Sequence, residues 1–201
     1  MRKFIPSFLL YSRIPVALAI LILAWLQPSG YDNIIVALLI YGVVSDFLDG
    51  FTARMWHLST EHLRKADSNV DQFFWLVTAV AVYLITPQFY HTYKWHIILL
   101  VIMEAAAYLI SYIRFRNVVA THAILSKLWV VTLLCTFIQI VLTGDSGWVF
   151  IVCFWVGLIS RLEIIAIMLV LKNWTNDVPG IYHAIQLRKG KTIKRNRIFN
   201  G

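Results

Sequence analysis

Two pairs of aspartates in neighbouring apolar segments are the residues whose types and spacing could carry out chemistry. Asp46 and Asp49 are three residues apart, and Asp67 and Asp71 are four apart, so each pair would share one face of a helix. A short connection joins the two segments, which must therefore run antiparallel as neighbours. The two pairs can then face each other at similar depth, and four carboxylates that converge in a low-dielectric site need compensating cations.

Divalent metal ions are the natural counterions for such a cluster, because hard cations prefer oxygen ligands. Two of them side by side would hold a diphosphate and stabilise both the attacking and the leaving oxygen of a displacement. Gly50 and Ala53, which follow the first pair, are small enough for a ligand to approach the helix backbone. Arg54 comes next, and its guanidinium can bind a phosphate with two hydrogen bonds. These residues predict a site for a metal-bound diphosphate.

Two other interpretations account for the aspartates without such a site. They could form salt bridges with Arg54, Arg64 and Lys65 near the connection between the segments. They could also line a cation or proton pathway, because carboxylates within membranes serve transporters too. Two pairs in helical phase, accompanied by small residues and an arginine, fit the salt-bridge interpretation poorly. A cation pathway leaves Gly50, Ala53 and Arg54 unexplained.

The elements that must position these residues are membrane-spanning helices. Of the 201 residues, 60% are hydrophobic and only 14% are charged, whereas soluble domains have about 25% charged residues. Because about 20 apolar residues suffice to cross a bilayer, we expect an all-α integral membrane bundle of six helices in a single domain, 1–201. The predicted spans are 5–27, 33–56, 66–86, 95–114, 124–143 and 148–171.

The distribution of basic residues predicts the orientation. The connections after the first and fifth spans lack Lys and Arg, whereas the N-terminal end and the C-terminal tail carry them. Positive residues favour the cytoplasmic side, so we expect both termini and the aspartate site there, in the inner (cytoplasmic) cell membrane. The tail, 172–201, is expected to lie on anionic lipid and not to bind nucleic acid. Its basic run comprises Arg188, Lys189, Lys191, Lys194, Arg195 and Arg197.

Further charged residues lie within the predicted spans, where charges usually face the bundle interior. They are Arg13 in the first span, Glu104 in the fourth, and Arg161 and Glu163 in the sixth. Arg161 and Glu163 are two residues apart, so they point to different sides of the helix and need separate partners. Glu104 would either pair with Arg161 or line a cavity for a substrate.

Residues 46–71 resemble the signature of the CDP-alcohol phosphotransferase family, which is D-x-x-D-G-x-x-A-R, eight residues, G, three residues, D, three residues, D. Every position matches except one, because Leu63 stands where the family has its second glycine, near the nucleotide. Residues 5–9 with Arg13 resemble the family's opening segment, and residues 126–127 resemble a Gly-Lys pair of relatives. The resemblance therefore extends over the whole chain.

This resemblance implies an enzyme of phospholipid biosynthesis that transfers a phosphatidyl group from CDP-diacylglycerol to an alcohol and releases CMP. Asp46, Asp49 and Asp67 would bind two divalent cations, Mg²⁺ or Mn²⁺. Asp71 would share this metal site and act as the general base for the attacking hydroxyl. Family members are commonly homodimers, which implies a homodimer here. The residues implied to lie along the nucleotide and its diphosphate are Asp49, Gly50, Ala53 and Arg54.

The acceptor alcohol is less constrained. In relatives with a phosphorylated acceptor, basic residues of the later spans bind the acceptor phosphate; Lys127 matches such a position best, and the further candidates are Arg114, Arg116 and Arg161. We therefore expect glycerol-3-phosphate, the acceptor of a phosphatidylglycerophosphate synthase. Inositol phosphate, phosphatidylglycerol, serine and choline stay open. Outside this chemistry, the alternatives are a cation-coupled carrier and a non-catalytic scaffold, for which the departure at Leu63 would be the reason.

Overall fold

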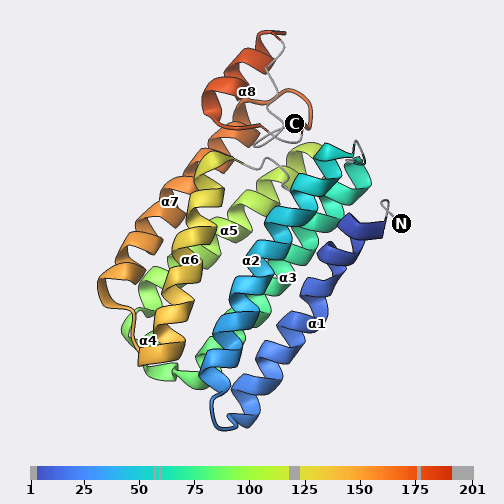
Figure 1. Cartoon of the computed structure of the whole chain (residues 1–201). Helices are drawn as coiled ribbons and strands as arrows, with labels where there is room; N and C mark the ends of the chain where they lie inside the picture. The colour runs from blue at the N-terminus through green and yellow to red at the C-terminus, as the bar shows by residue number, and fades with distance from the viewer. Residues whose placement is uncertain (1–3, 57, 59, 118–122, 176–177, 192–201) are drawn as a thin grey trace. The chain divides into compact units, whose positions relative to one another are not determined.

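The computed structural model describes residues 4–56, 58, 60–117, 123–175 and 178–191, and this part of the chain is built from α-helices without a strand. Residues 192–201, which hold the end of the predicted basic tail with Lys194, Arg195 and Arg197, lie outside the described residues. Figure 1 shows the helices in chain order. Their bounds are α1 Phe4–Leu26, α2 Tyr31–Met55, α3 Glu61–Ile85, α4 Pro87–Thr92, α5 Lys94–Phe115, α6 Ile124–Thr143, α7 Gly147–Val170 and α8 Ile181–Arg188.

Six helices of the described chain are long and apolar enough to cross a membrane, namely α1, α2, α3, α5, α6 and α7. The predicted all-α class and the six spans are confirmed, and the chain is an integral membrane protein. The two short helices, α4 and α8, were not predicted from the sequence. Each is shorter than a span, and α8 lies within the segment predicted as a tail.

Helix α3 begins at Glu61, earlier than the predicted start at residue 66. The cause is Thr60, whose backbone is extended and whose hydroxyl accepts a hydrogen bond from the Leu63 N–H at 3.2 Å. Such a cap satisfies one of the free N–H groups of the first turn, so the helix extends into the polar segment ahead of the apolar span. Leu63 therefore lies in a regular first turn, and Asp67 and Asp71 lie inside the helix.

The chain divides into two compact units. The first unit comprises Met1–Lys94 and Leu133–Phe150, and the second comprises Trp95–Thr132 and Ile151–Gly201. The four aspartates belong to the first unit. The basic residues considered for the acceptor belong to the second.

In the first unit, α1 packs against both α2 and α3 and runs beside them (Figure 1). Its buried residues recur every three or four positions, as one face of a helix requires. That face consists of Pro6, Leu10, Arg13, Ala17, Ile20 and Ala24. The corresponding face of α2 consists of Ile35, Leu39, Gly42, Ser45, Asp49 and Ala53. Between α2 and α3, the ring of Phe74 packs onto Gly42. These contacts bring polar residues of α1, α2 and α3 into one interior.

The second unit has an apolar core formed by α5, α7 and α8. Its buried residues are Ala107, Ala123, Ile164, Ile167, Met168, Leu171, Val178 and Ala184. The C-terminal end of α7 is closed by two arginines, because Arg114 donates to the Leu171 carbonyl at 2.9 Å and Arg188 donates to the Val170 carbonyl at 3.2 Å. Carbonyls at a helix C-terminus have no partner within the helix and carry partial negative charge. Arg188, part of the predicted basic run, therefore stabilises the junction of α7 and α8.

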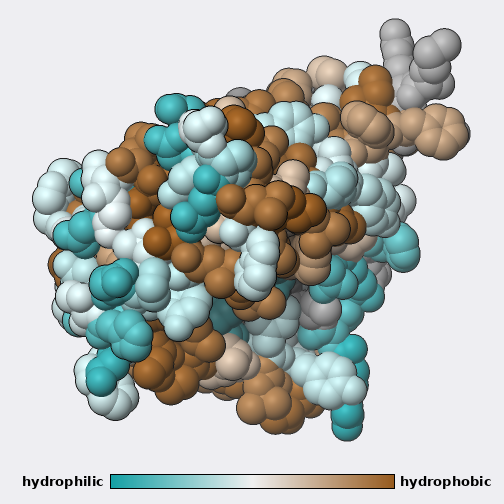
Figure 2. Space-filling model, turned by 90° about the horizontal axis from the view of Figure 1, so that it is seen from below, coloured by the Kyte–Doolittle hydropathy of each residue, from teal (hydrophilic) through white to brown (hydrophobic). Residues whose placement is uncertain are grey.

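The outer faces of the spans carry large apolar side chains. Trp25, Trp95 and Trp148 are each more than 70% exposed, and each lies near an end of its helix, where tryptophan favours the membrane–water interface. The space-filling view shows apolar residues at the surface beside polar ones (Figure 2). This arrangement suits a protein whose surroundings are lipid along the spans and water at their ends.

Candidate metal and diphosphate site

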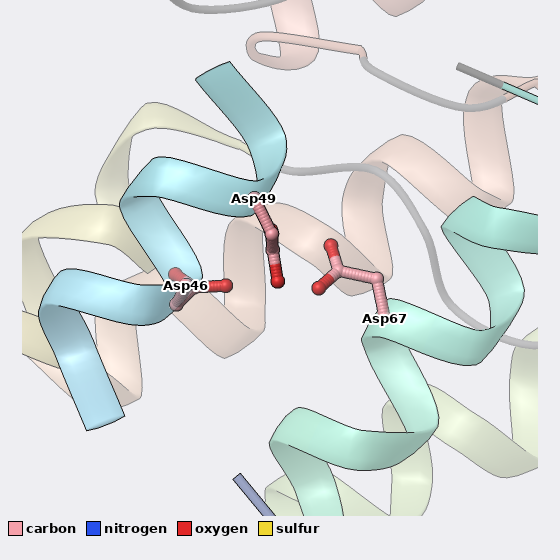
Figure 3. Close-up of side chains that lie close together, drawn as sticks. All are labelled: Asp46, Asp49 and Asp67. Atoms are coloured by element: carbon pink, nitrogen blue, oxygen red, sulfur yellow. The ribbon is translucent and has the colours of Figure 1, made fainter. Parts of the chain in front are cut away.

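Three of the predicted ligands converge between α2 and α3. Asp46 and Asp49 project from α2 and Asp67 projects from α3, and each offers a carboxylate oxygen that lies within 4.8 Å of those of the other two. Figure 3 shows the three carboxylates pointing toward one another. Asp46 and Asp49 are three residues apart, so they share one face of α2, and that face is turned toward α3.

The donor set fits a hard divalent cation. Ca²⁺ takes oxygen ligands at about 2.3–2.6 Å and Mg²⁺ at about 2.0–2.1 Å, so two oxygens bound to the same ion are at most about 5 Å apart around Ca²⁺ and about 4 Å apart around Mg²⁺. The oxygens of the three aspartates, within 4.8 Å of one another, meet the wider limit, and a small inward movement of the side chains meets the narrower one. All three donors are carboxylates, which favours Mg²⁺ or Mn²⁺ over metals that prefer nitrogen or sulfur ligands.

The four aspartates differ in depth. The side chains of Asp49 and Asp67 are 6% and 14% exposed, whereas those of Asp71 and Asp46 are 32% and 38% exposed. The site therefore has a buried half formed by Asp49 and Asp67 and an open half formed by Asp46 and Asp71. A group that must meet a substrate belongs in the open half.

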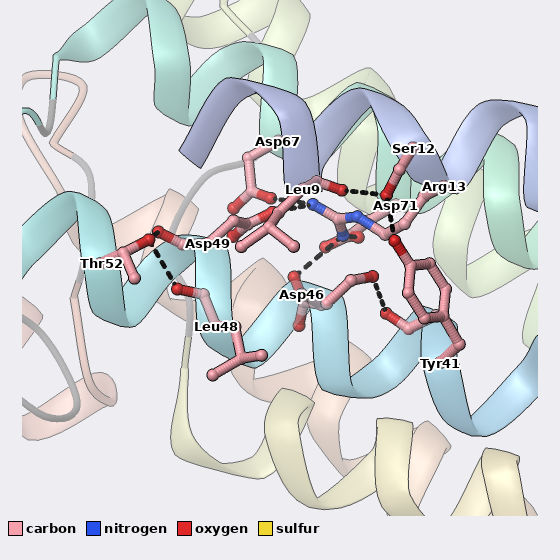
Figure 4. Close-up of polar contacts among 12 residues, drawn as sticks. Leu9, Ser12, Arg13, Tyr41, Asp46, Leu48, Asp49, Thr52, Asp67 and Asp71 are labelled. Carbon is pink, nitrogen blue, oxygen red and sulfur yellow. Dashed lines mark hydrogen bonds and ion pairs between the residues drawn. The ribbon is translucent and has the colours of Figure 1, made fainter. Parts of the chain in front are cut away.

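Arg13 of α1 contacts all four aspartates, although the sequence analysis assigns it no role in the site. Its Nη1 donates to Asp46 Oδ1 at 2.9 Å and also to Asp71. Its Nη2 donates to Asp67 Oδ1 at 2.8 Å and to Asp49 Oδ2 at 2.5 Å. The Arg13 side chain is 1% exposed, and Figure 4 shows it reaching between the aspartates of the two other helices.

Arg13 lies there because of the packing of α1. It lies on the face of α1 that is buried against α2 and α3, three residues after Leu10 and four before Ala17. Nearby, the hydroxyls of Ser12 and Tyr41 form a hydrogen bond of 2.9 Å that joins α1 to α2 (Figure 4). One signal in the sequence pointed to Arg13, since a lone charge in an apolar span usually faces the bundle interior. The sequence does not say which interior groups it meets.

The residues predicted to lie along a diphosphate follow the aspartates on α2. The Arg54 guanidinium lies over the backbone of Gly50, since a Cβ atom added there would be 3.2 Å from Arg54 Nη1. Ala53 is 5% exposed and shares the buried face of Asp49. Gly50 lies one turn beyond Asp46 on α2. Because Gly50 has no side chain, there is space beside its backbone, and the Arg54 side chain lies at the edge of this space.

The basic residues predicted for the acceptor make definite contacts within the second unit. Arg161 is buried, its Nε lies 3.0 Å from Glu104 Oε2, and its Cζ lies 4.4 Å from the centre of the Trp129 ring. The pairing of Glu104 with Arg161, one of the two possibilities predicted for Glu104, is confirmed. Arg161 and Glu163 point to different sides as expected, because Glu163 lies against Gly180.

The other acceptor candidates differ in their surroundings. Arg114 donates to the end of α7, as described above, and Arg116 lies over the Tyr112 ring at 5.4 Å. Lys127 is half-buried in the first turn of α6, where its backbone N–H donates to the Ala123 carbonyl at 3.4 Å. Lys127 and Ser126 thus both lie in the first turn of α6, which begins at Ile124.

A family model described as CDP-alcohol phosphatidyltransferase matches residues 3–180. The match includes Arg13, the four aspartates and the four basic residues predicted for the acceptor, and it ends just before α8 begins at Ile181. No curated protein and no solved structure matches the chain significantly.

Proposed function

The chain belongs to the CDP-alcohol phosphatidyltransferase family, and on this premise we propose that it transfers a phosphatidyl group from CDP-diacylglycerol to glycerol-3-phosphate with release of CMP. Members of this family transfer phosphatidyl groups, so the chain is a transferase that uses a CDP-alcohol donor. The observation that carries the proposal is the convergence of Asp46, Asp49 and Asp67 beside the Gly50–Arg54 stretch of α2.

The metal site consists of Asp46, Asp49 and Asp67, joined by Asp71, and it takes two divalent cations, Mg²⁺ or Mn²⁺. The close approach of the three carboxylate oxygens supports this assignment. When bound, the cations neutralise charge on the diphosphate and make CMP a better leaving group. Asp49 and Asp67, the more buried of the four, would hold the metal on the side away from bulk water.

Arg54 binds the donor diphosphate, and Gly50 permits that diphosphate to approach the helix. The support is the position of the Arg54 guanidinium over the bare backbone of Gly50. A guanidinium presents two parallel N–H donors to a phosphate, so Arg54 fixes the orientation of the donor as well as adding charge. Ala53, on the same face as Asp49, bounds the nucleotide.

Asp71 is the general base. Its carboxylate is 32% exposed, so an acceptor hydroxyl from the aqueous side can reach it. Asp71 takes the hydroxyl proton while the acceptor oxygen forms a bond to the phosphorus that carries diacylglycerol. The bond from that phosphorus to the bridging oxygen of the diphosphate breaks, and CMP leaves with that oxygen. A positioned base of this kind contributes about 10²–10⁴-fold to a rate.

Lys127 binds the phosphate of the acceptor, with Arg114, Arg116 and Arg161 as further basic groups of the second unit. The support is the resemblance of residues 126–127 to a Gly-Lys pair of relatives, together with the position of Lys127 in the first turn of α6. A phosphorylated acceptor such as glycerol-3-phosphate follows from this choice.

The site faces the cytoplasm, in the inner cell membrane, and the protein acts as a homodimer. The basic residues of the N- and C-terminal ends support that orientation. The dimer is an expectation from the resemblance to the family alone.

Purified protein in lipid nanodiscs tests the proposal. It is incubated with CDP-diacylglycerol, Mg²⁺ or Mn²⁺, and each acceptor in turn: glycerol-3-phosphate, inositol phosphate, phosphatidylglycerol, serine and choline. CMP release and the mass of the lipid product are measured, and we expect phosphatidylglycerophosphate. The Asp71→Asn variant should lose turnover, while Asp32→Asn, at the opposite end of α2, should keep it. Absence of CMP with every acceptor, from protein shown to be folded, would overturn the proposal.

A further inference from the structure

The four carboxylates of the metal site are already gathered around one cation that belongs to the chain. Arg13 is 1% exposed and donates hydrogen bonds to aspartates on two other helices. Buried carboxylates repel one another, so a cluster of four that lacked a cation would be costly to fold. The single charge of Arg13 offsets part of that repulsion and leaves a formal excess of negative charge if all four are ionised.

The contacts of Arg13 are shared between the two halves of the site. Nη2 meets the buried pair, Asp49 and Asp67, and Nη1 meets the open pair, Asp46 and Asp71. The three aspartates whose oxygens converge closely enough for a metal ion are all among these partners. The guanidinium and a divalent cation therefore draw on the same carboxylates.

We propose that Arg13 is a positioning residue that holds the four aspartates together as an internal cation and is in competition with divalent metal for them. This inference rests on the proposed metal site. Arg13 stabilises the metal-free protein more than the metal-bound protein, because its positive charge repels the incoming ions and some of its hydrogen bonds must be given up to them. The four carboxylates are thus held together before the metal binds. The site then binds metal more weakly than the same four carboxylates would bind it without Arg13.

The Arg13→Gln variant tests the competition without any substrate. Mn²⁺ binding is measured by the loss of the free-Mn²⁺ electron paramagnetic resonance signal, and Tm is measured with and without Mn²⁺. We expect the metal-free variant to melt at a lower temperature than the wild type. We expect its Kd for Mn²⁺ to fall, on the order of tenfold, because one unit charge at close range is removed. The rise in Tm on adding Mn²⁺ should be larger than in the wild type.

A matched control is Arg161→Gln, which also removes a buried, ion-paired arginine but belongs to the second unit. It should lower Tm and leave the Kd for Mn²⁺ unchanged. Arg13→Lys keeps the charge on a smaller head that cannot reach all four carboxylates at once, so its metal-free Tm and its Kd should fall between wild type and Arg13→Gln. If Arg13→Gln does not fold, Arg13→Lys replaces it in the test, and a Kd for Mn²⁺ below that of the wild type would support the competition.

The outcomes separate the two proposals. If Mn²⁺ neither binds to the wild type nor raises its Tm, the metal site itself is wrong. If Mn²⁺ binds to the wild type and the Arg13 variants bind it equally or more weakly, the metal site stands and the competition is overturned. A fall in Tm with unchanged metal affinity would give Arg13 a structural role only.

Discussion

The ring of Phe74 occupies the space that a side chain on Gly42 would need. A Cβ atom built on Gly42 would lie 2.3 Å from Phe74 Cζ, well inside van der Waals contact. Gly42 is one turn before Asp46 on α2, and Phe74 is one turn after Asp71 on α3. The contact therefore fixes the register of the two helices that carry the metal ligands.

Gly42→Ala should consequently disturb the site from outside it. Overpacking of a buried contact costs about 1–3 kcal/mol, and a shift of α2 against α3 would separate the carboxylates. We expect a lower Tm and weaker Mn²⁺ binding together. Adding Phe74→Leu should restore part of both, because the smaller side chain makes room for the new methyl group. Equal losses in the single and double variants would contradict this role of the contact.

Asp71→Asn should affect turnover much more than donor binding. The amide keeps the size of the carboxylate but cannot accept a proton, so kcat should fall by about 10²–10⁴-fold while KM for CDP-diacylglycerol changes little. Asp49→Asn, in the buried half of the site and among the three carboxylates that converge, should weaken Mn²⁺ binding more than Asp71→Asn does. Steady-state rates and metal titrations of both variants provide the comparison. A preserved kcat in Asp71→Asn would remove Asp71 from the role of base.

The aspartates and their helices could be predicted because both depend on local patterns. The spacings of Asp46 to Asp49 and Asp67 to Asp71 set helix faces, and long apolar runs set the spans. The role of Arg13 depends on which faces of α1, α2 and α3 pack together, and that information is not in the spacing of any single segment. The sequence marked Arg13 as a charge inside a span and as part of the segment that resembles the family's opening, but it did not name the partners of Arg13.

Helix ends were predicted less well where polar chemistry decides them. Hydrophobicity places the start of the third span at residue 66, but the Thr60 cap starts α3 at Glu61. Helices α4 and α8 are too short to give a span signal, and α8 is stabilised by contacts such as that of Arg188 with the end of α7. The partner of Glu104 was left open for the same reason as that of Arg13, because it lies on another helix.

Gly50→Ala should raise the KM for CDP-diacylglycerol while the protein stays folded. The added Cβ would lie 3.2 Å from Arg54 Nη1, the far end of a flexible side chain that can move aside. Alanine also favours helix over glycine by about 1 kcal/mol, so Tm should not fall. The KM should rise because Arg54 is displaced and the diphosphate loses its approach to the backbone.

Arg54→Lys serves as the partner variant to Gly50→Ala. It keeps the positive charge but loses the paired N–H donors, so it should also raise the KM for the donor. Both variants should leave the KM for glycerol-3-phosphate near that of the wild type. A rise in the acceptor KM alone would place Arg54 near the other substrate.

Glu104→Gln should destabilise the second unit strongly. Arg161 is 7% exposed, and removing one member of a buried ion pair costs about 3–5 kcal/mol because the other charge stays buried without compensation. The Trp129 ring, 4.4 Å from Arg161 Cζ, recovers only about 0.5–2 kcal/mol through its cation–π interaction. The double variant Glu104→Gln with Arg161→Gln should therefore be more stable than Glu104→Gln alone, as measured by Tm.

The same double variant, Glu104→Gln with Arg161→Gln, also tests the acceptor assignment. If Lys127 supplies the main phosphate contact, the KM of the double variant for glycerol-3-phosphate should stay close to that of the wild type. Lys127→Gln should raise that KM about tenfold or more, which is the loss expected when a hydrogen bond to a charged group is removed. A large rise in the double variant with none in Lys127→Gln would transfer the phosphate-binding role to Arg161.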